Sequence, residues 1–118
     1  MTPIEKKLDR MVQELSNNHY CHVCGHRKAD AIHHIVSRGN KLLRYEISNL
    51  LPVCYDCHRA IHDGKVDVKK YIAKERWDYL QDIKNMSLKD HLLYIGSTLP
   101  EFYKDCEISL RRLLNEND

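Results

Sequence analysis

The sequence has few of the residues and runs that mark several protein classes. Its 118 residues include four glycines, three prolines and one tryptophan, and 42% are hydrophobic, which excludes collagen-like and low-complexity compositions. The longest stretch without Asp, Glu, Lys or Arg, residues 15–26, is largely polar and shorter than the ~20 apolar residues that a membrane span needs. We therefore expect one folded domain that does not cross a membrane.

Neither sign of charge dominates the sequence. Nineteen basic residues against seventeen acidic ones give a net charge of +2, which is too small to indicate a nucleic-acid partner by itself. The first ten residues are charged from Glu5 onward and lack the apolar core and small-residue cleavage site of a secretory signal. We expect the protein to remain inside the cell, where cysteines stay reduced.

Hydrophobic spacing and turn residues predict the elements of the first half. Apolar residues at helical spacing, preceded by the capping pair Thr2 and Glu5, predict a helix over about 3–16. Short apolar and β-branched runs predict strands over 31–36 and 50–53. A short helix is expected over 54–62, with a glycine stop directly after it. The first half therefore predicts an α+β unit of strand, loop, strand and helix.

The second half shows helical periodicity without metal-ligand residues. Apolar positions predict three helices, over about 68–83, 88–95 and 102–114, separated by polar and glycine-containing turns. We expect residues 1–66 to form the functional unit and residues 67–118 to form an all-helical extension for packing, dimerisation or partner contact.

Four cysteines form two CxxC pairs, Cys21 with Cys24 and Cys54 with Cys57. Each pair chelates an ion on a tight turn, and two such pairs brought together complete the tetrahedral four-sulfur site typical of structural Zn²⁺. We predict that zinc joins the two turns.

Three other interpretations of these cysteines are weaker. Disulfide or redox use would require a setting that the N-terminus does not indicate. The CxxCH run ending at His58 also matches haem attachment, but haem would leave the first pair unexplained. A Cys2His2 finger fails because the gap between Cys24 and His33 is too short.

Four histidines that zinc does not need indicate a second site. His58 and His62 lie one turn apart on the expected helix, a spacing that allows both rings to bind one ion. His33 and His34 are neighbours on an expected strand and point to opposite sides, so one can be a ligand while the other does something else. Three protein ligands would leave open positions on the metal, as in catalytic sites.

The run AIHHIVSRG followed by ISNLLPVCYDCHRAIH resembles the HNH endonuclease family. The resemblance covers residues 21–62 and implies a ββα-metal fold, in which a hairpin and a helix hold one divalent cation on a DNA phosphate. By position it implies His33, His58 and His62 as metal ligands and His34 as the general base. Asn49 is similar to the residue that braces the loop and the base.

The resemblance implies metal-dependent hydrolysis of DNA phosphodiesters, with 5′-phosphate and 3′-hydroxyl products. The general base would activate water, while the metal stabilises the leaving group. Three imidazoles favour Zn²⁺, Ni²⁺, Co²⁺ or Mn²⁺, although Mg²⁺ stays a candidate. Basic residues flanking the motif are candidates for holding neighbouring phosphates: Arg38, Arg44 and Arg59, and also Arg27, Lys28 and Lys41.

The small size and zinc layout are also similar to phage-encoded endonucleases, including those that resolve branched DNA. We therefore expect double-stranded DNA as the partner, with branched DNA as a hypothesis, and a cytoplasmic location in a bacterial or phage-infected cell. A homodimer would cut both strands and a monomer would nick, and both remain open. The alternative function is a zinc-stabilised nucleic-acid-binding module that does not cleave, and a zinc-stapled protein adaptor is a further one.

Overall fold

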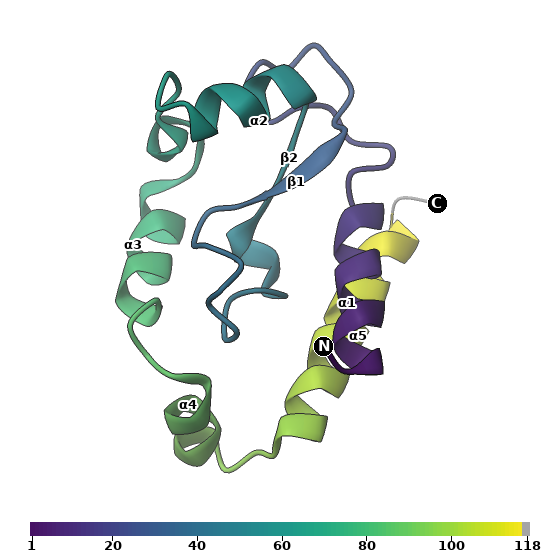
Figure 1. The fold of residues 1–118 in the computed structure, drawn as a ribbon, viewed down its shortest axis with the longest axis vertical. Coiled ribbons are helices and arrows are strands. Elements are labelled where there is room, and N and C mark those ends of the chain that lie inside the picture. The colour runs from purple at the N-terminus through teal and green to yellow at the C-terminus, as the bar shows by residue number, and fades with distance from the viewer. Residues whose placement is uncertain (117–118) are drawn as a thin grey trace.

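The computed structural model describes residues 1–116, arranged as helices around a two-stranded sheet (Figure 1). The elements in chain order are α1 (Pro3–Glu14), β1 (Ala31–His34), η1 (Ile47–Asn49), β2 (Leu50–Val53), α2 (Tyr55–His62), η2 (Val68–Tyr71), α3 (Lys74–Ile83), α4 (Leu88–Ile95) and α5 (Leu99–Glu116). This architecture confirms the predicted α+β class. Within the described range, no helix is long and apolar enough to span a membrane.

Helix α1 begins at the predicted capping box. The Thr2 hydroxyl accepts a hydrogen bond from the Glu5 backbone N–H, and the Glu5 carboxylate accepts one from the Thr2 backbone N–H at 2.9 Å. Both bonds satisfy donors that the first helical turn leaves without partners. The helix ends at Glu14, close to the predicted end.

Strands β1 and β2 form an antiparallel pair in which His33 lies opposite Leu51 and His34 opposite Leu50. The prediction that β1 extends to Val36 was wrong, because the chain leaves the sheet after His34. The Ile35 N–H donates to the Asn49 carbonyl, and the Val36 N–H donates to the Asn49 side chain. The first bond keeps the register of the ladder, but the second goes to a side chain instead of the partner strand's backbone, so regular pairing ends there.

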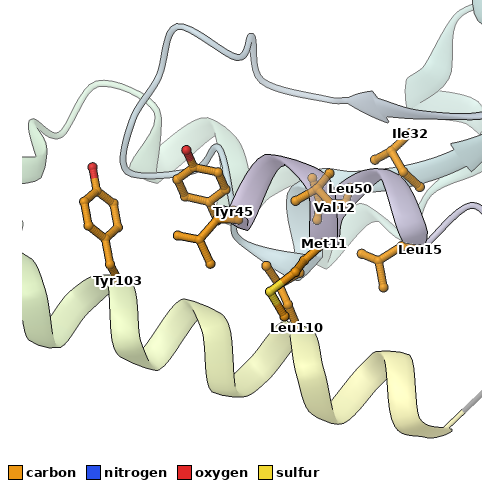
Figure 2. Packing of buried hydrophobic residues seen from close by; sticks show 9 residues of the cluster. Met11, Val12, Leu15, Ile32, Tyr45, Leu50, Tyr103 and Leu110 are labelled. Carbon is orange, nitrogen blue, oxygen red and sulfur yellow. The ribbon is translucent and has the colours of Figure 1, made fainter. Parts of the chain in front are cut away.

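The larger core lies between α1, α5 and one face of the sheet (Figure 2). Leu8 and Val12 of α1 are fully buried with Leu110 of α5, and Ile32 and Leu50 of the two strands complete the cluster. Burying each such side chain contributes about 1.5–3 kcal/mol. The predicted helical extension therefore shares its core with the N-terminal helix, since α5 runs back alongside α1 (Figure 1).

A second, smaller core lies on the other face of the sheet. It comprises Leu51, Val53 and two of the cysteines, with Val68 and Ile72 packed against it. This packing explains why the single helix expected over 68–83 is divided into η2 and α3. Ile72 and Ala73 adopt extended conformations between the two helices, and Ile72 packs against the small core.

The remaining helix boundaries follow local signals. Cys54 caps α2, and Gly64 after it has a φ of 74°, which a residue with a Cβ adopts only with strain. The Ser87 hydroxyl caps α4, which ends at Gly96 in the left-handed region. Helix α5 begins at Leu99, earlier than the predicted Phe102, because Pro100 fits the first helical turn.

Candidate active site and metal centres

The four cysteines of the two CxxC pairs lie together. Their sulfur atoms are all within 4.8 Å of one another. Cys21 and Cys24 lie on a turn closed by hydrogen bonds from the Cys21 N–H to the Arg27 carbonyl at 2.7 Å and from the Gly25 N–H to the Cys21 carbonyl at 2.9 Å. Cys54 and Cys57 lie at the start of α2. The sulfur atoms at the junction of β2 and α2 thus lie next to those of the Cys21–Cys24 turn, as a four-sulfur site requires.

The surroundings of the sulfur atoms suit a bound cation. The Val23 N–H donates to Cys21 Sγ at 3.4 Å, and the Cys57 N–H donates to Cys54 Sγ at 3.5 Å. Burial acts to raise the pKa of the Cys21 thiol, but hydrogen bonds from neighbouring backbone N–H groups have a larger combined effect. The pKa of Cys21 is therefore lowered to about 6. Burial and the adjacent sulfur atoms raise the pKa of Cys57 to about 12. A cation held by the four sulfur atoms would compensate the negative charge of ionised thiols, and zinc would suit this ligand set.

Three histidines converge on a second point. His33 comes from β1 and is 7% exposed, while His58 and His62 come from successive turns of α2. The ring of His33 lies 5.4 Å from that of His58 and 5.5 Å from that of His62 between centroids. One ring nitrogen of each residue lies within 4.8 Å of the others. The predicted ligand set is therefore assembled by one strand and one helix face.

The spacing of these nitrogens fits a shared metal ion. The Nε2 atoms of His58 and His62 are 3.0 Å apart. Adjacent ligands at bonds of ~2.1 Å lie ~3.0 Å apart in an octahedron and ~3.4 Å apart in a tetrahedron. Burial, followed by the charges of His58 and His62, lowers the pKa of His33 to about 4. The ring of His33 is then neutral near pH 7, which is the form that binds metal.

His34 faces the opposite side of the strand and has a separate partner. Its Nε2 lies 3.1 Å from the carbonyl oxygen of Arg44. Because a carbonyl only accepts hydrogen bonds, Nε2 carries the proton and Nδ1 holds the lone pair of the neutral ring. Burial lowers the pKa of His34, and the hydrogen bond to Arg44 partly opposes that effect. The geometry thus leaves Nδ1 as the basic atom.

Asn49 is fully buried, and its side chain forms hydrogen bonds with both ends of the loop over residues 36–43. Its Oδ1 accepts from the Val36 N–H at 2.6 Å, and its Nδ2 donates to the carbonyls of Val36 and Leu43, each at 3.0 Å. Leu43 directly precedes Arg44, whose carbonyl binds His34. Asn49 therefore holds the loop that carries the partner of His34.

The three clustered histidines and His34 line one open cleft of about 600 Å³. The residues that line it are Gln13, Ala31, Ile32, His33, His34, Ile35, Ser37, Arg38, His58 and His62. Gln13 belongs to α1, and nothing in the sequence linked it to the motif. The cleft thus combines the three clustered rings with His34 and one predicted phosphate contact, Arg38.

The candidate phosphate-binding residues differ in their surroundings. Arg59 has a side chain that is 69% exposed and lies 3.9 Å from Asp63, so its guanidinium remains accessible. The Nε and Nη2 of Arg44 donate to the two oxygens of Asp9, and its side chain is 18% exposed. These contacts make Arg44 a weaker candidate than Arg59 for binding a phosphate. Arg27 is paired with Asp56, whereas no ion pair involves Lys28 or Lys41 within residues 1–116.

Sequence reasoning also missed Arg76 of α3. Its guanidinium donates to the carbonyls of Ser48 and Leu50, the latter at 2.8 Å, and thereby supports the segment that contains Asn49. No local pattern marks such a contact, because the partners are far apart in the sequence.

Comparisons with known proteins agree with the motif. Residues 21–64 match the family described as HNH endonuclease, which confirms the resemblance over this segment. The chain is 43% identical over 53 residues to a protein named mitochondrial DNA mismatch repair protein mutS homolog, from Sarcophyton glaucum. That alignment covers 41% of the chain and 5% of the relative. No solved structure matches the chain.

Proposed function

We propose that this protein is a metal-dependent endonuclease that hydrolyses phosphodiester bonds in double-stranded DNA. The observation that carries the proposal is the arrangement in one cleft of three converging imidazoles beside His34, whose Nδ1 has no hydrogen-bond partner among residues 1–116. The match of residues 21–64 to the HNH endonuclease family supports the reaction class. Branched DNA belongs to the same proposal as a substrate to be tested.

His34 is proposed to remove a proton from the attacking water through Nδ1. The hydrogen bond to the Arg44 carbonyl keeps the proton on Nε2, and Asn49 holds the loop on which that carbonyl lies. A positioned general base of this kind contributes about 10²- to 10⁴-fold in rate. His34 is thus assigned the role of general base. Asn49 is assigned the role of holding the loop that contacts His34.

His33, His58 and His62 are proposed to hold the catalytic cation in their neutral forms. A divalent cation bound there would neutralise the charge that develops on the phosphate and on the leaving oxygen. Because the three ligands are imidazoles, Mn²⁺, Ni²⁺, Co²⁺ or Zn²⁺ should support activity at least as well as Mg²⁺. The four cysteines are assigned a separate zinc ion with a structural role.

The proposal is tested by incubating the protein with supercoiled plasmid and each divalent metal, or with EDTA. We expect nicked or linear DNA with 5′-phosphate ends in the presence of metal and intact plasmid with EDTA. His58→Ala should raise the metal concentration needed for cleavage at least 10-fold, because it removes a ligand. The matched control is His91→Ala in α4, whose ring contacts Phe102 and not the cluster. Failure to cleave plasmid or branched DNA with any metal would refute the proposal.

Arg38 and Arg59 are proposed to contact DNA phosphates beside the cleft. Changing either to Gln should weaken DNA binding and lower the slope of log K against log salt by about 1, as expected for one lost phosphate contact. Arg27→Gln serves as the control, since Arg27 is already paired with Asp56. Fluorescence anisotropy across a salt series measures this effect, and equal slopes for all the variants and the wild type would remove these arginines from the interface.

A further inference from the structure

We propose that Asp9 of α1 is a positioning residue for His34 and acts through Arg44. The inference rests on the proposed function, because it assumes that His34 is the base. Asp9 lies outside residues 21–64, the segment that matches the HNH endonuclease family. The structure therefore assigns part of the support of the active site to a helix that the motif does not include.

The first link is the ion pair between Asp9 and Arg44. Arg44 Nε donates to Asp9 Oδ1 at 3.0 Å and Arg44 Nη2 donates to Oδ2 at 2.8 Å, so the two groups meet in a two-pronged geometry. The side chain of Asp9 is 23% exposed and that of Arg44 is 18% exposed. Such paired, charge-assisted bonds fix orientation better than a single contact does. The partnership also raises the pKa of Arg44.

The second link is the backbone of Arg44. The same residue that is anchored to α1 by its side chain offers its carbonyl oxygen to His34 Nε2 at 3.1 Å. Arg44 Nη1 also donates to the carbonyl of Arg38 at 3.3 Å, which closes the loop around the guanidinium. The position of the carbonyl thus depends on where Asp9 holds the side chain.

Asn49 does not replace this anchor. Its amide bonds reach Val36 and Leu43, but none of them involves the peptide group that contains the Arg44 carbonyl. The residue after Arg44 is also tied to α1, because the Tyr45 hydroxyl donates to the Glu5 carbonyl at 3.3 Å. Helix α1 therefore holds the carbonyl from two sides. If Asp9 no longer restrains Arg44, we expect the ring of His34 to lose its fixed tautomer.

The test compares Asp9→Asn, which removes the carboxylate with little change of shape, with Asp9→Glu, which retains it. The control is Glu107→Gln, which breaks another ion pair of α1, that between Lys7 and Glu107 at 2.8 Å, without a route to His34. We measure kcat and KM for plasmid cleavage at saturating metal. In parallel, two-bond ¹H–¹⁵N NMR correlations identify which nitrogen of His34 carries the proton.

Asp9→Asn should lower kcat about 10- to 100-fold with KM unchanged, the size expected when a supporting contact of a catalytic group is lost. The NMR spectrum of that variant should show a mixture of His34 tautomers, whereas the spectrum of the wild type should show protonation at Nε2. Asp9→Glu should recover most of kcat, and Glu107→Gln should match the wild type in both measurements.

The proposal is overturned if Asp9→Asn keeps the wild-type kcat, if kcat falls while the tautomer stays at Nε2, or if Glu107→Gln loses as much activity. The NMR measurement does not depend on cleavage. A protein that cuts no DNA would refute the proposed function, while a loss of the fixed tautomer in Asp9→Asn would still support the positioning of His34 by Asp9.

Discussion

Replacing His34 with alanine is expected to lower the rate of metal-dependent DNA cleavage about 10²- to 10⁴-fold, because it removes the proposed general base from the cleft. DNA affinity and zinc content should stay the same, since His34 belongs to neither metal cluster. Single-turnover cleavage of plasmid measures the rate, and anisotropy measures the affinity.

His91→Ala is again the control for replacing a histidine. A His34→Ala variant that cleaves at the wild-type rate would show that another group activates water. The same experiment separates the nuclease from the alternative function, a zinc-stabilised nucleic-acid-binding module. That module would bind DNA with the usual dependence on salt, but neither the wild type nor the variant would cut it.

Removing zinc from the cysteine site should unfold the hairpin and α2. A structural zinc site of this kind contributes on the order of 10 kcal/mol of folding free energy, which exceeds what the small core around Leu51 and Val53 supplies. We expect a strong chelator or Cys54→Ser to abolish the thermal transition of this region, measured by circular dichroism. The core between α1 and α5 also loses Ile32 and Leu50 when the hairpin unfolds, so it should be weakened as well.

Two further variants test which residues bind which metal ion. Cys106→Ser, in α5 and outside the cysteine cluster, should keep the zinc content and the thermal transition of the wild type. His58→Ala should lose the catalytic metal but retain the tightly bound zinc, measured by elemental analysis after dialysis. A Cys54→Ser protein that retains its zinc and its melting temperature would contradict the structural assignment of this site.

Features with local causes were predictable from the sequence. The capping box of Thr2 and Glu5, the Cys54 start of α2 and the Gly64 stop depend on residues within a few positions of one another. The convergence of the cysteines was also predictable, because metal-ligand spacing carries its own geometric requirement. The histidine pair on one face of α2 followed from helical periodicity.

Features set by distant contacts were not predictable in this way. The early end of β1 depends on Asn49, and the division of η2 from α3 depends on packing of Ile72 against the small core. The ion pair of Arg44 with Asp9 joins residues that no periodicity relates, so Arg44 seemed free for a phosphate. Tertiary structure decides such cases, since several partners are equally compatible with the local sequence.

The alternation of β1 has a consequence for how this site tolerates change. His33 faces α2 and shares its side of the sheet with Leu51, whereas His34 shares the other side with Ile32 and Leu50, against α1 and α5. Adjacent residues thus belong to the two clusters that pack on opposite faces of one sheet. Under the proposed assignment of His34 as base and His33 as metal ligand, we expect substitutions packed against α1 and α5 to affect the base more than the metal, and substitutions around α2 to affect the metal more than the base.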